Sequence, residues 1–409
     1  MAQAAMARGT DRFERKRVAI LDAATELLNS RGVKGLTLSE AAAAVGLSTT
    51  SVTYYFKRKD DLAAACMLRG LDDLNVIVDE ALAPASPEAC LRALIGLYFD
   101  RQRGAAVGEA AALPAFAEVR ALNDPQRSEV VAALSRLFRK LRQIFDAPEL
   151  AWLSRGRKTA RTAMVLEQLF WASAWLPRRQ PDDYGRIGEQ VFDILVRGMA
   201  GEASRWAPMP IAIGKLAPRD RSAMSQETFL LAATRLINAR GYRGASVDKI
   251  SAELNVTKGS FYHHNDAKDD LVTACFDRTY EVMTRLQGLA MGLDGDQWTK
   301  LISAGAAVAE YQLSPHGPLL RTSALTALPE AIRAPLVEQS ERISERFATM
   351  VADGVSEGSI RAVDPFIAAL MLNATLNASA ELGFLLPGVS QKAAAAVFVR
   401  PLMTGVFQK

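Results

Sequence analysis

The chain repeats a block of its own sequence, and this repeat limits the possible folds more than any other feature. When the 409-residue sequence is compared with itself after a shift of 209 residues, residues 20–66 align with residues 229–275 without a gap. Of the 47 aligned pairs, 17 are identical, including the run that begins at Lys59 and its counterpart at Lys268. The period of 209 residues is far longer than a solenoid unit, which has about 20–50 residues. We therefore expect each copy to belong to a whole domain.

The junction between the two copies is predicted at residues 207–218, where three prolines and one glycine oppose regular helix. Aromatic residues make up only 7% of the chain and alanine is frequent, which favours helix over strand. We therefore expect an all-α chain of two tandem units, each with a block of short helices followed by a larger helical domain. The predicted limits are 1–207 (short helices 12–71, larger domain 72–207) and 208–409 (short helices 221–280, larger domain 281–409).

Local signals divide the first copy into short helices. Apolar residues at helical spacing predict a helix over 14–31, and Gly32 lies where such a helix ends. Thr37, followed by Glu40, is typical of a helix N-terminus, and Ser48 is placed to cap a helix over residues 49–56. Two short helices joined by a turn form a helix-turn-helix, whose second helix is suited to the major groove of DNA.

The two blocks resemble the DNA-binding region of the TetR family of repressors. The family pattern is a helix ending in a small residue and Gly, then Thr and an apolar-spaced helix. A turn follows, then a recognition helix ending Tyr-x-His-Phe, and a Lys before an acidic pair and Leu. The first copy matches with LLNSRGVKGLTLSEAAAAVGLSTTSVTYYFKRKDDL and the second with LINARGYRGASVDKISAELNVTKGSFYHHNDAKDDL. The resemblance covers this block in each half.

Both copies depart from the family pattern. In the first copy, Thr53 and Tyr55 stand where the family has Tyr and His. In the second copy, Asn265 replaces the phenylalanine that packs the recognition helix on its core, and Asp266 places a negative charge close to where DNA phosphates would lie. We therefore expect the second block to be looser or degenerate.

The charge balance also favours the first copy as the stronger DNA binder. Residues 8–69 hold 11 Lys and Arg against 7 Asp and Glu, whereas residues 217–278 hold 9 against 8. The whole chain has a net charge of +4, which is compatible with a nucleic-acid partner without requiring one.

The resemblance implies a set of DNA-contacting residues in each copy. The open alternatives are N-capping for the hydroxyl residues, partial burial for the aromatic ones and a solvated surface position for the lysines. Val52, Phe56 and Phe261 are expected in the core. The candidates are Thr37, Ser48, Thr49, Thr50, Ser51, Thr53, Tyr54, Tyr55 and Lys59 in the first copy, and Ser246, Thr257, Lys258, Gly259, Ser260, Tyr262, His263, His264 and Lys268 in the second.

For the remainder of each half, the resemblance implies a helical domain with an effector pocket and a helix pair for dimerisation. The alternative for every pocket candidate is ordinary core packing. Asn373, Asn377 and Glu381 form a polar stripe on one predicted helix, which indicates a core or interface helix and not a membrane span. The basic run that includes Arg161 is expected to be solvated. The pocket candidates are Phe99, Phe116, Trp171, Trp175, Tyr311, Phe347 and Asn377.

The sequence therefore predicts a DNA-binding transcriptional regulator, a repressor by family default, that a small apolar effector releases from double-stranded DNA. We expect the two halves to pair within one chain as a pseudo-dimer on a non-palindromic operator. A homodimer of tandem chains is the alternative architecture. A ligand-sensing or interaction module with a degenerate second DNA-binding block is the alternative function.

Other classes of protein are not favoured. The sequence contains no HExxH, Walker or clustered Cys/His motif, so we expect neither an enzyme nor a bound metal or cofactor. Its three cysteines include no CxxC pair, and the first residues lack the apolar segment of a signal peptide. We expect a cytoplasmic protein without a membrane partner.

Overall fold

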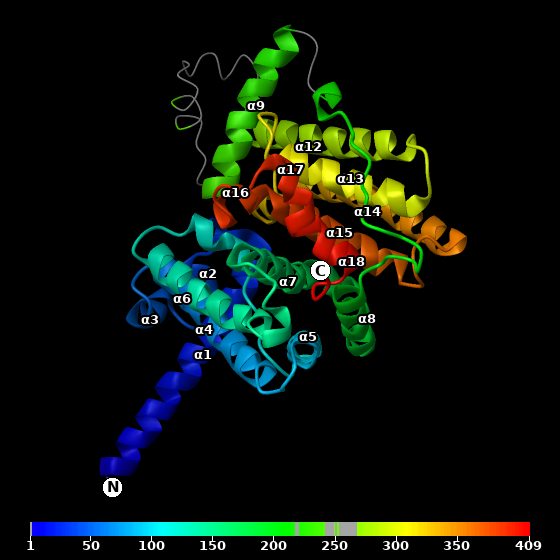
Figure 1. Ribbon diagram of the computed structural model, residues 1–409. Helices are drawn as coiled ribbons and strands as arrows, with labels where there is room; N and C mark the ends of the chain where they lie inside the picture. The colour runs from blue at the N-terminus through cyan, green and yellow to red at the C-terminus, as the bar shows by residue number, and fades with distance from the viewer. Residues whose placement is uncertain (1, 217–220, 242–248, 250–251, 253–267) are drawn as a thin grey trace.

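The computed structural model describes residues 2–216, 221–241, 249, 252 and 268–409. Within these residues all regular elements are helical, and the only β pairing is an isolated bridge between Ala200 and Ile360. The prediction of an all-α chain is confirmed (Figure 1). In the described part of the chain, no helix is long and apolar enough to cross a membrane.

The first half begins with three helices that precede a larger helical domain (Figure 1). Its α-helices are α1 (Ala2–Gly35), α2 (Leu38–Ala44), α3 (Thr49–Tyr55), α4 (Lys59–Ala81), α5 (Pro87–Ala106), α6 (Gln126–Leu141), α7 (Arg155–Trp175) and α8 (Tyr184–Arg197). Its 3₁₀ helices are η1 (Phe116–Ala121), η2 (Arg142–Phe145), η3 (Pro148–Leu150), η4 (Leu176–Arg178) and η5 (Pro181–Asp183).

The second half follows the same order of elements where the structure describes it. Its α-helices are α9 (Arg221–Arg240), α12 (Lys268–Met291), α13 (Gln297–Gln312), α14 (Glu330–Glu357), α15 (Pro365–Ala378), α16 (Leu382–Leu385), α17 (Gln391–Ala394) and α18 (Arg400–Thr404). The short turns are η6 (Ile213–Leu216), η8 (Thr322–Ala327), η9 (Ser379–Glu381) and the π-helical η10 (Ala395–Val399).

An asparagine ties the first helix of each half to a later segment of the same half. The Asn29 side chain donates to the Leu113 carbonyl and accepts from the Ala115 N–H, both at 2.8 Å. Asn238, at the equivalent position in α9, donates to the Leu319 carbonyl at 2.9 Å. Because the sequence repeat reappears as a repeated contact, the two halves share this part of their construction.

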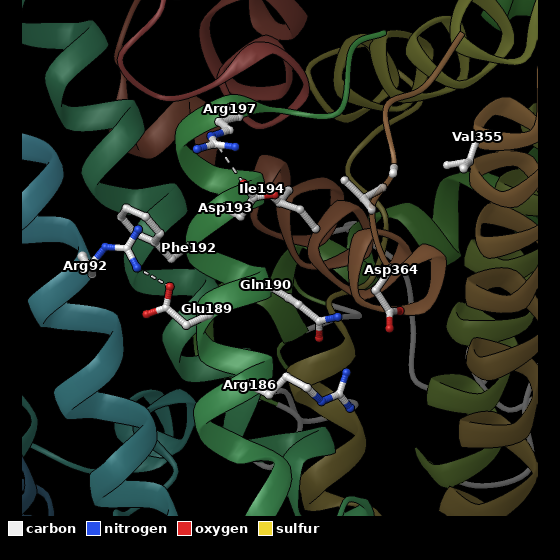
Figure 2. A pocket seen from close by; sticks show the side chains of 12 residues that line it. Arg92, Arg186, Glu189, Gln190, Phe192, Asp193, Ile194, Arg197, Val355 and Asp364 are labelled. Carbon is white, nitrogen blue, oxygen red and sulfur yellow. Dashed lines mark hydrogen bonds and ion pairs between the residues drawn. The ribbon is translucent and has the colours of Figure 1, made fainter. Parts of the chain in front are cut away.

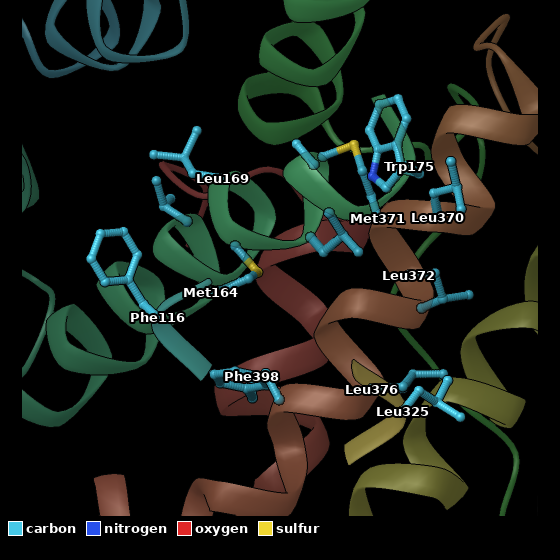
Figure 3. Packing of buried hydrophobic residues seen from close by; sticks show 14 of the residues in the cluster. Phe116, Met164, Leu169, Trp175, Leu325, Leu370, Met371, Leu372, Leu376 and Phe398 are labelled. Atoms are coloured by element: carbon cyan, nitrogen blue, oxygen red, sulfur yellow. The ribbon is translucent and has the colours of Figure 1, made fainter. Parts of the chain in front are cut away.

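Helices α7 and α15 bring the two halves into contact. Helix α7 packs against α15, α16 and η10, and α8 packs against α15 and α18. Figure 3 shows Met164 and Trp175 of α7, Met371 of α15 and Phe398 of η10 in one cluster of buried side chains. Within this apolar contact the buried Gln168 side chain donates to the Met371 carbonyl at 3.0 Å, so its amide nitrogen is satisfied across the interface.

The ends of α8 and α18 contact each other through reciprocal backbone hydrogen bonds. Met199 N–H donates to the Met403 carbonyl and Val406 N–H donates to the Leu195 carbonyl, both at 2.8 Å. The same kind of pairing in both directions is typical of an isologous interface, such as that of a two-fold dimer. Here both partners belong to one chain.

Two glycines make this close approach possible. Gly198 ends α8 with φ of 67°, and Gly405 ends α18 with φ of 104°, values that favour glycine. A Cβ atom at Gly198 would overlap the Met403 carbonyl oxygen, and one at Gly405 would overlap the Val196 carbonyl oxygen. Both helix ends therefore require glycine for conformation and for space.

The segment between α8 and α9 runs along the second half. Ser204 Oγ donates to the Ser359 carbonyl at 2.6 Å, and Trp298 Nε1 donates to the Arg205 carbonyl at 2.8 Å. Residues predicted to end the first half thus bond to the second, while the limits of the two domains stay a prediction.

Candidate nucleic-acid interface

Helix α3 presents one polar face to solvent and buries the opposite face. Val52 is fully buried and Phe56, which caps the helix, is 6% exposed, as expected for core positions. Thr49 and Thr50 are exposed, and Tyr54 is 77% exposed. Since an exposed tyrosine of this size gains little from packing, its position fits contact with a partner molecule better than a role in the core.

Several of the predicted contact residues already serve the local fold. Thr37 caps α2 by accepting from the Glu40 N–H at 3.1 Å, and Ser48 caps α3 by accepting from the Ser51 N–H at 3.2 Å. The Thr53 hydroxyl donates back to the Thr49 carbonyl at 2.9 Å. The predicted capping roles of Thr37 and Ser48 are confirmed, while any DNA contact by these hydroxyls stays a prediction.

An aromatic cluster joins Phe13, in the N-terminal half of α1, to the end of α3. The Phe13 ring stacks on Tyr55 at 4.6 Å between centroids, and Tyr54 meets Tyr55 edge-on at 5.5 Å. Phe13 also meets the Tyr54 ring edge-on at 6.0 Å. The exposed Tyr54 is therefore held in place by its neighbours, and Phe13 is a supporting residue that the repeat did not reveal because it lies before the aligned block.

Basic side chains follow directly after α3. Lys57 and Arg58 are exposed, and Arg58 pairs with Asp61 at 3.5 Å. Lys59 lies at the start of α4, and its Nζ donates to the Lys34 carbonyl at 3.3 Å. These cations follow the end of α3, where phosphates would flank a helix that lies in a groove of DNA.

The corresponding residues of the second copy mostly lie outside the described residues. This applies to the predicted core residue Phe261 and to the two departures Asn265 and Asp266. Lys268 begins α12, but its side chain is not described. The predicted contacts outside the described residues are Ser246, Thr257, Lys258, Gly259, Ser260, Tyr262, His263 and His264.

The described framework of the second copy nevertheless matches the first. Cys66 Sγ contacts the Leu21 carbonyl at 3.6 Å, and Cys275 Sγ contacts the Leu230 carbonyl at the same distance. Both thiols are buried, and burial raises the pKa of Cys66 to about 11 and that of Cys275 to about 12. Helices α9 and α12 are therefore arranged as α1 and α4 are.

The seven pocket candidates are mostly buried side chains of the helical core. Phe99, Phe347 and Tyr311 are at most 1% exposed, and Tyr311 receives a hydrogen bond from Arg278 at 3.2 Å. Phe116 and Trp175 are buried as well, and Asn377 donates to Glu167 at 3.3 Å. Trp171 differs, because its Nε1 is buried without a hydrogen-bond partner. Their role in ligand binding stays a prediction.

A cavity of about 530 Å³ lies elsewhere, between α8 and residues 362–364 of the second half (Figure 2). Arg92 and Arg186 line it with Glu189 and Gln190, and none of the seven candidates does. The Arg92 guanidinium stacks over the Phe192 ring at 4.0 Å and pairs with Glu189. The sequence signal for this cavity is the set of polar residues on α8, namely Arg186, Glu189, Gln190 and Asp193, and the predicted pocket of aromatic residues does not include them.

Similarity to known proteins occurs in the same two segments as the internal repeat. The sequence profile described as "Bacterial regulatory proteins, tetR family" matches residues 20–66 and 229–275. The chain therefore carries two tandem TetR-like blocks. These matched ranges are those of the internal repeat, so the TetR-type DNA-binding region occurs once in each half.

Curated relatives match over part of their length. The HTH-type transcriptional regulator BetI of Burkholderia mallei is 36% identical over 89 residues, which is 21% of this chain and 46% of BetI. The transposon Tn10 TetC protein of Escherichia coli is 40% identical over 58 residues, which is 12% of this chain and 29% of TetC. The matched stretch thus spans less than half of each of these relatives.

Solved structures of similar chains include TetR-family regulators. PfmR from Thermus thermophilus has a TM-score of 0.36 and 18% identity, with 43% of this chain and 97% of PfmR covered. FadR from Bacillus subtilis, solved with stearoyl-CoA, has a TM-score of 0.36 and 17% identity, with 44% of this chain and 96% of FadR covered. AibR, solved with isovaleryl coenzyme A and operator DNA, has a TM-score of 0.35 and 19% identity, with 44% and 97% covered.

Proposed function

We propose that this protein is a sequence-specific DNA-binding transcriptional regulator whose first DNA-binding block reads double-stranded DNA through α3. The observation that carries the proposal is the division of α3 into two faces. Val52 and Phe56 hold the helix on its core, while Thr49, Thr50 and Tyr54 are exposed on the other side. A helix held in this way can enter the major groove without disturbing the fold.

In the proposed complex, base reading and phosphate binding fall to different residues. Thr49 and Thr50 reach base edges, and the Tyr54 hydroxyl bonds a phosphate or a base. Lys59 binds a phosphate beside the end of α3. Its ammonium group then gives up the hydrogen bond to the Lys34 carbonyl and forms a charge-assisted bond to the phosphate. This function would place the protein in the cytoplasm with the chromosome and requires no enzymatic chemistry.

Two variants test the DNA-binding proposal. We expect Tyr54→Phe to weaken binding by about threefold to tenfold, because one hydrogen bond is lost. We expect Lys59→Ala to weaken binding to all sequences alike and to reduce the salt dependence by about one counterion. The measurement is fluorescence anisotropy with a DNA site selected from a random library, at several salt concentrations. Lys300→Ala, in α13 of the second half, is the control for charge loss away from α3.

We further propose that the two halves act as a pseudo-dimer within one chain. The support is the reciprocal bonding of Leu195 with Val406 and of Met199 with Met403, together with the buried contact of α7 and α15. A regulator of this kind binds two half-sites about one helical turn apart. Because the two DNA-binding blocks differ in sequence, the operator would be non-palindromic.

We also propose that the protein represses transcription and that a small apolar effector releases it from DNA. The support is the Trp171 Nε1 group, a buried donor without a partner. Since leaving such a donor unpaired costs about 1–3 kcal/mol, an effector with one acceptor atom would gain affinity there. The test is tryptophan fluorescence and DNA binding during titration with the amphipathic anionic dye anilinonaphthalene sulfonate, with Trp171→Phe as the variant. Binding of the dye without any change in DNA affinity contradicts an effector role for this site.

A further inference from the structure

The short helix η1 lies between the first helices of the two halves. It packs against α1 of its own half and against α9 of the other half. Gly32 and Gly241, which are equivalent in the repeat, both face it: a Cβ atom at Gly32 would overlap the Glu118 carboxylate, and one at Gly241 would lie 3.9 Å from the Arg120 Cβ atom. One six-residue segment therefore contacts both DNA-binding blocks.

Glu118 serves the first block. Its Oε2 atom accepts a hydrogen bond from the Val33 N–H at 2.9 Å, and the residue is only 7% exposed. The contact falls where α1 is interrupted, because Gly32 has φ of 67° and leaves the helical conformation. The bond between the buried Glu118 carboxylate and the Val33 N–H therefore holds the end of α1 in the direction that leads to the helix-turn-helix.

Arg120 serves the second block from the first half. Its guanidinium donates to the Asn238 carbonyl near the end of α9 and also to Glu381. Glu381 receives a second guanidinium, because Arg321 Nη1 donates to it at 2.6 Å. Arg321 also pairs with Glu167 of α7 at 3.3 Å, so the network returns to the first half.

The network is partly buried, with the Arg120 side chain 30% exposed, and it keeps its charges. The side chains of Arg321 and Glu381 are 12% and 21% exposed. Burial alone would raise the pKa of Glu381, but the Arg321 and Arg120 guanidiniums outweigh it and hold the pKa below its ordinary value. Removing one member of such a network leaves the others poorly compensated, so its geometry is strongly defined.

The two blocks are therefore held differently despite their shared asparagine contacts. Asn29 bonds the Ala115 N–H in the first half, and Asn238 bonds the Arg321 N–H at 3.0 Å in the second. Where the first half has Ala115, the second has the charged Arg321. The first block also packs across the halves, because α1 contacts η8 of the second half. The charged contact across the halves, however, lies on the side of α9, while the bond through Glu118 holds the first block within its own half.

The geometry points to η1 as the shared anchor that sets the orientation of the second DNA-binding block relative to the first, with Arg120 as its positioning residue. This inference rests on the proposed two-headed binding of DNA. A rigid anchor between the two DNA-binding blocks makes DNA binding depend on the spacing of the half-sites. A flexible connection between the blocks tolerates changes in that spacing. Spacing preference is therefore a property of Arg120 as well as of the recognition helices.

Hydrogen–deuterium exchange, measured without DNA, tests whether Arg120 and Glu118 hold different DNA-binding blocks. We expect Arg120→Gln to accelerate exchange about tenfold or more over residues 234–240 while residues 29–36 are unchanged. Glu118→Gln, two residues away on the same helix, is the matched control and should give the opposite pattern. Equal effects of both variants on both blocks, or none with Arg120→Gln, would overturn the inference.

Spacing of the half-sites tests the consequence for DNA. The probe is the duplex selected from a random library by the wild-type protein, with one or two base pairs inserted between its half-sites. We expect each insertion to weaken wild-type binding about tenfold and to weaken Arg120→Gln binding by less than about threefold. Glu118→Gln controls for general loosening, and thermal unfolding checks that both variants fold.

The outcomes separate the two proposals. If wild-type protein selects no DNA site, the proposed function fails, and the exchange pattern alone still decides whether Arg120 and Glu118 hold different blocks. If wild-type protein binds with a spacing preference and Arg120→Gln keeps the same preference, the shared anchor is wrong although the DNA-binding function stands.

Discussion

The backbone N–H of Val406 donates to the Leu195 carbonyl at 2.8 Å, which joins the end of the chain to the last turn of α8. Its counterpart is the bond from Met199 N–H to the Met403 carbonyl. Two subunits related by a two-fold axis make paired contacts of this kind between separate chains. In this structure both bonds join segments of one chain.

Gly198→Ala is expected to destabilise the protein by about 2–4 kcal/mol, because the residue has positive φ and its Cβ atom would overlap the Met403 carbonyl oxygen. The measurement is the free energy of unfolding in urea. Gly185→Ala in the same helix is the control: no atom lies within 4 Å of its Cβ position, so the change should be neutral or stabilise by up to about 1 kcal/mol. Similar effects of both variants would contradict the importance of the close contact between the ends of α8 and α18.

Arg161→Met is expected to cost about 2–4 kcal/mol, because its guanidinium is buried and donates to the Val406 carbonyl at 2.7 Å. Differential scanning calorimetry measures the change. Arg155→Met, at an exposed position of the same helix, should leave the melting temperature nearly unchanged. A small effect of Arg161→Met would show that the C-terminal residues are not held by this contact.

Acid is expected to weaken the network around η1. The folded-state pKa of Glu381 lies below its ordinary value of 4.5, so its stabilising contribution is present above that value and is lost as the pH falls through the folded-state pKa. Glu381→Gln should cost about 2 kcal/mol at neutral pH and progressively less below pH 4.5. Urea unfolding between pH 6 and 3 checks this.

An exposed ion pair gives the control for that titration. Glu341 pairs with Arg178, but their side chains are 46% and 59% exposed, so Glu341→Gln should change stability by less than about 0.5 kcal/mol at any pH. If Glu381→Gln behaves like Glu341→Gln, the buried network does not hold the halves together.

The buried thiols are expected to react slowly while the protein is folded. Burial raises the pKa of Cys66 to about 11 and that of Cys275 to about 12, so little thiolate is present at pH 8. Ellman's reagent should label both only after denaturation. Because these folded-state values are raised above the ordinary 9.0, the free energy of unfolding should also fall as the pH rises from 9 toward 11.

Local signals predicted the first block well. The caps Thr37 and Ser48 and the interruption at Gly32 lie where the sequence placed them, because capping and glycine conformation depend on residues a few positions apart. The predicted polar stripe, expected on a core or interface helix, reaches the first half through Asn377 and Glu381. Asn373 bonds Ser344 of the second half instead, and Glu381 lies in η9, beyond the end of α15.

Contacts between distant segments were not predictable from the same signals. Arg161 was expected in solvent and is 5% exposed, because the C-terminal residues cover it. The divergent sequence outside the repeat gave no sign that Glu118 and Arg120 face different blocks. Aromatic residues such as Phe99 were chosen as pocket candidates by type alone, and burial in a helical core selects the same type.

The central claim is that the two halves of one chain act together on one DNA site. Native mass spectrometry of the protein bound to the duplex selected from a random library tests it most directly. We predict one chain of 44.3 kDa per duplex, on a site with two unlike half-sites about one helical turn apart. Two chains per duplex on a palindromic site would contradict the account.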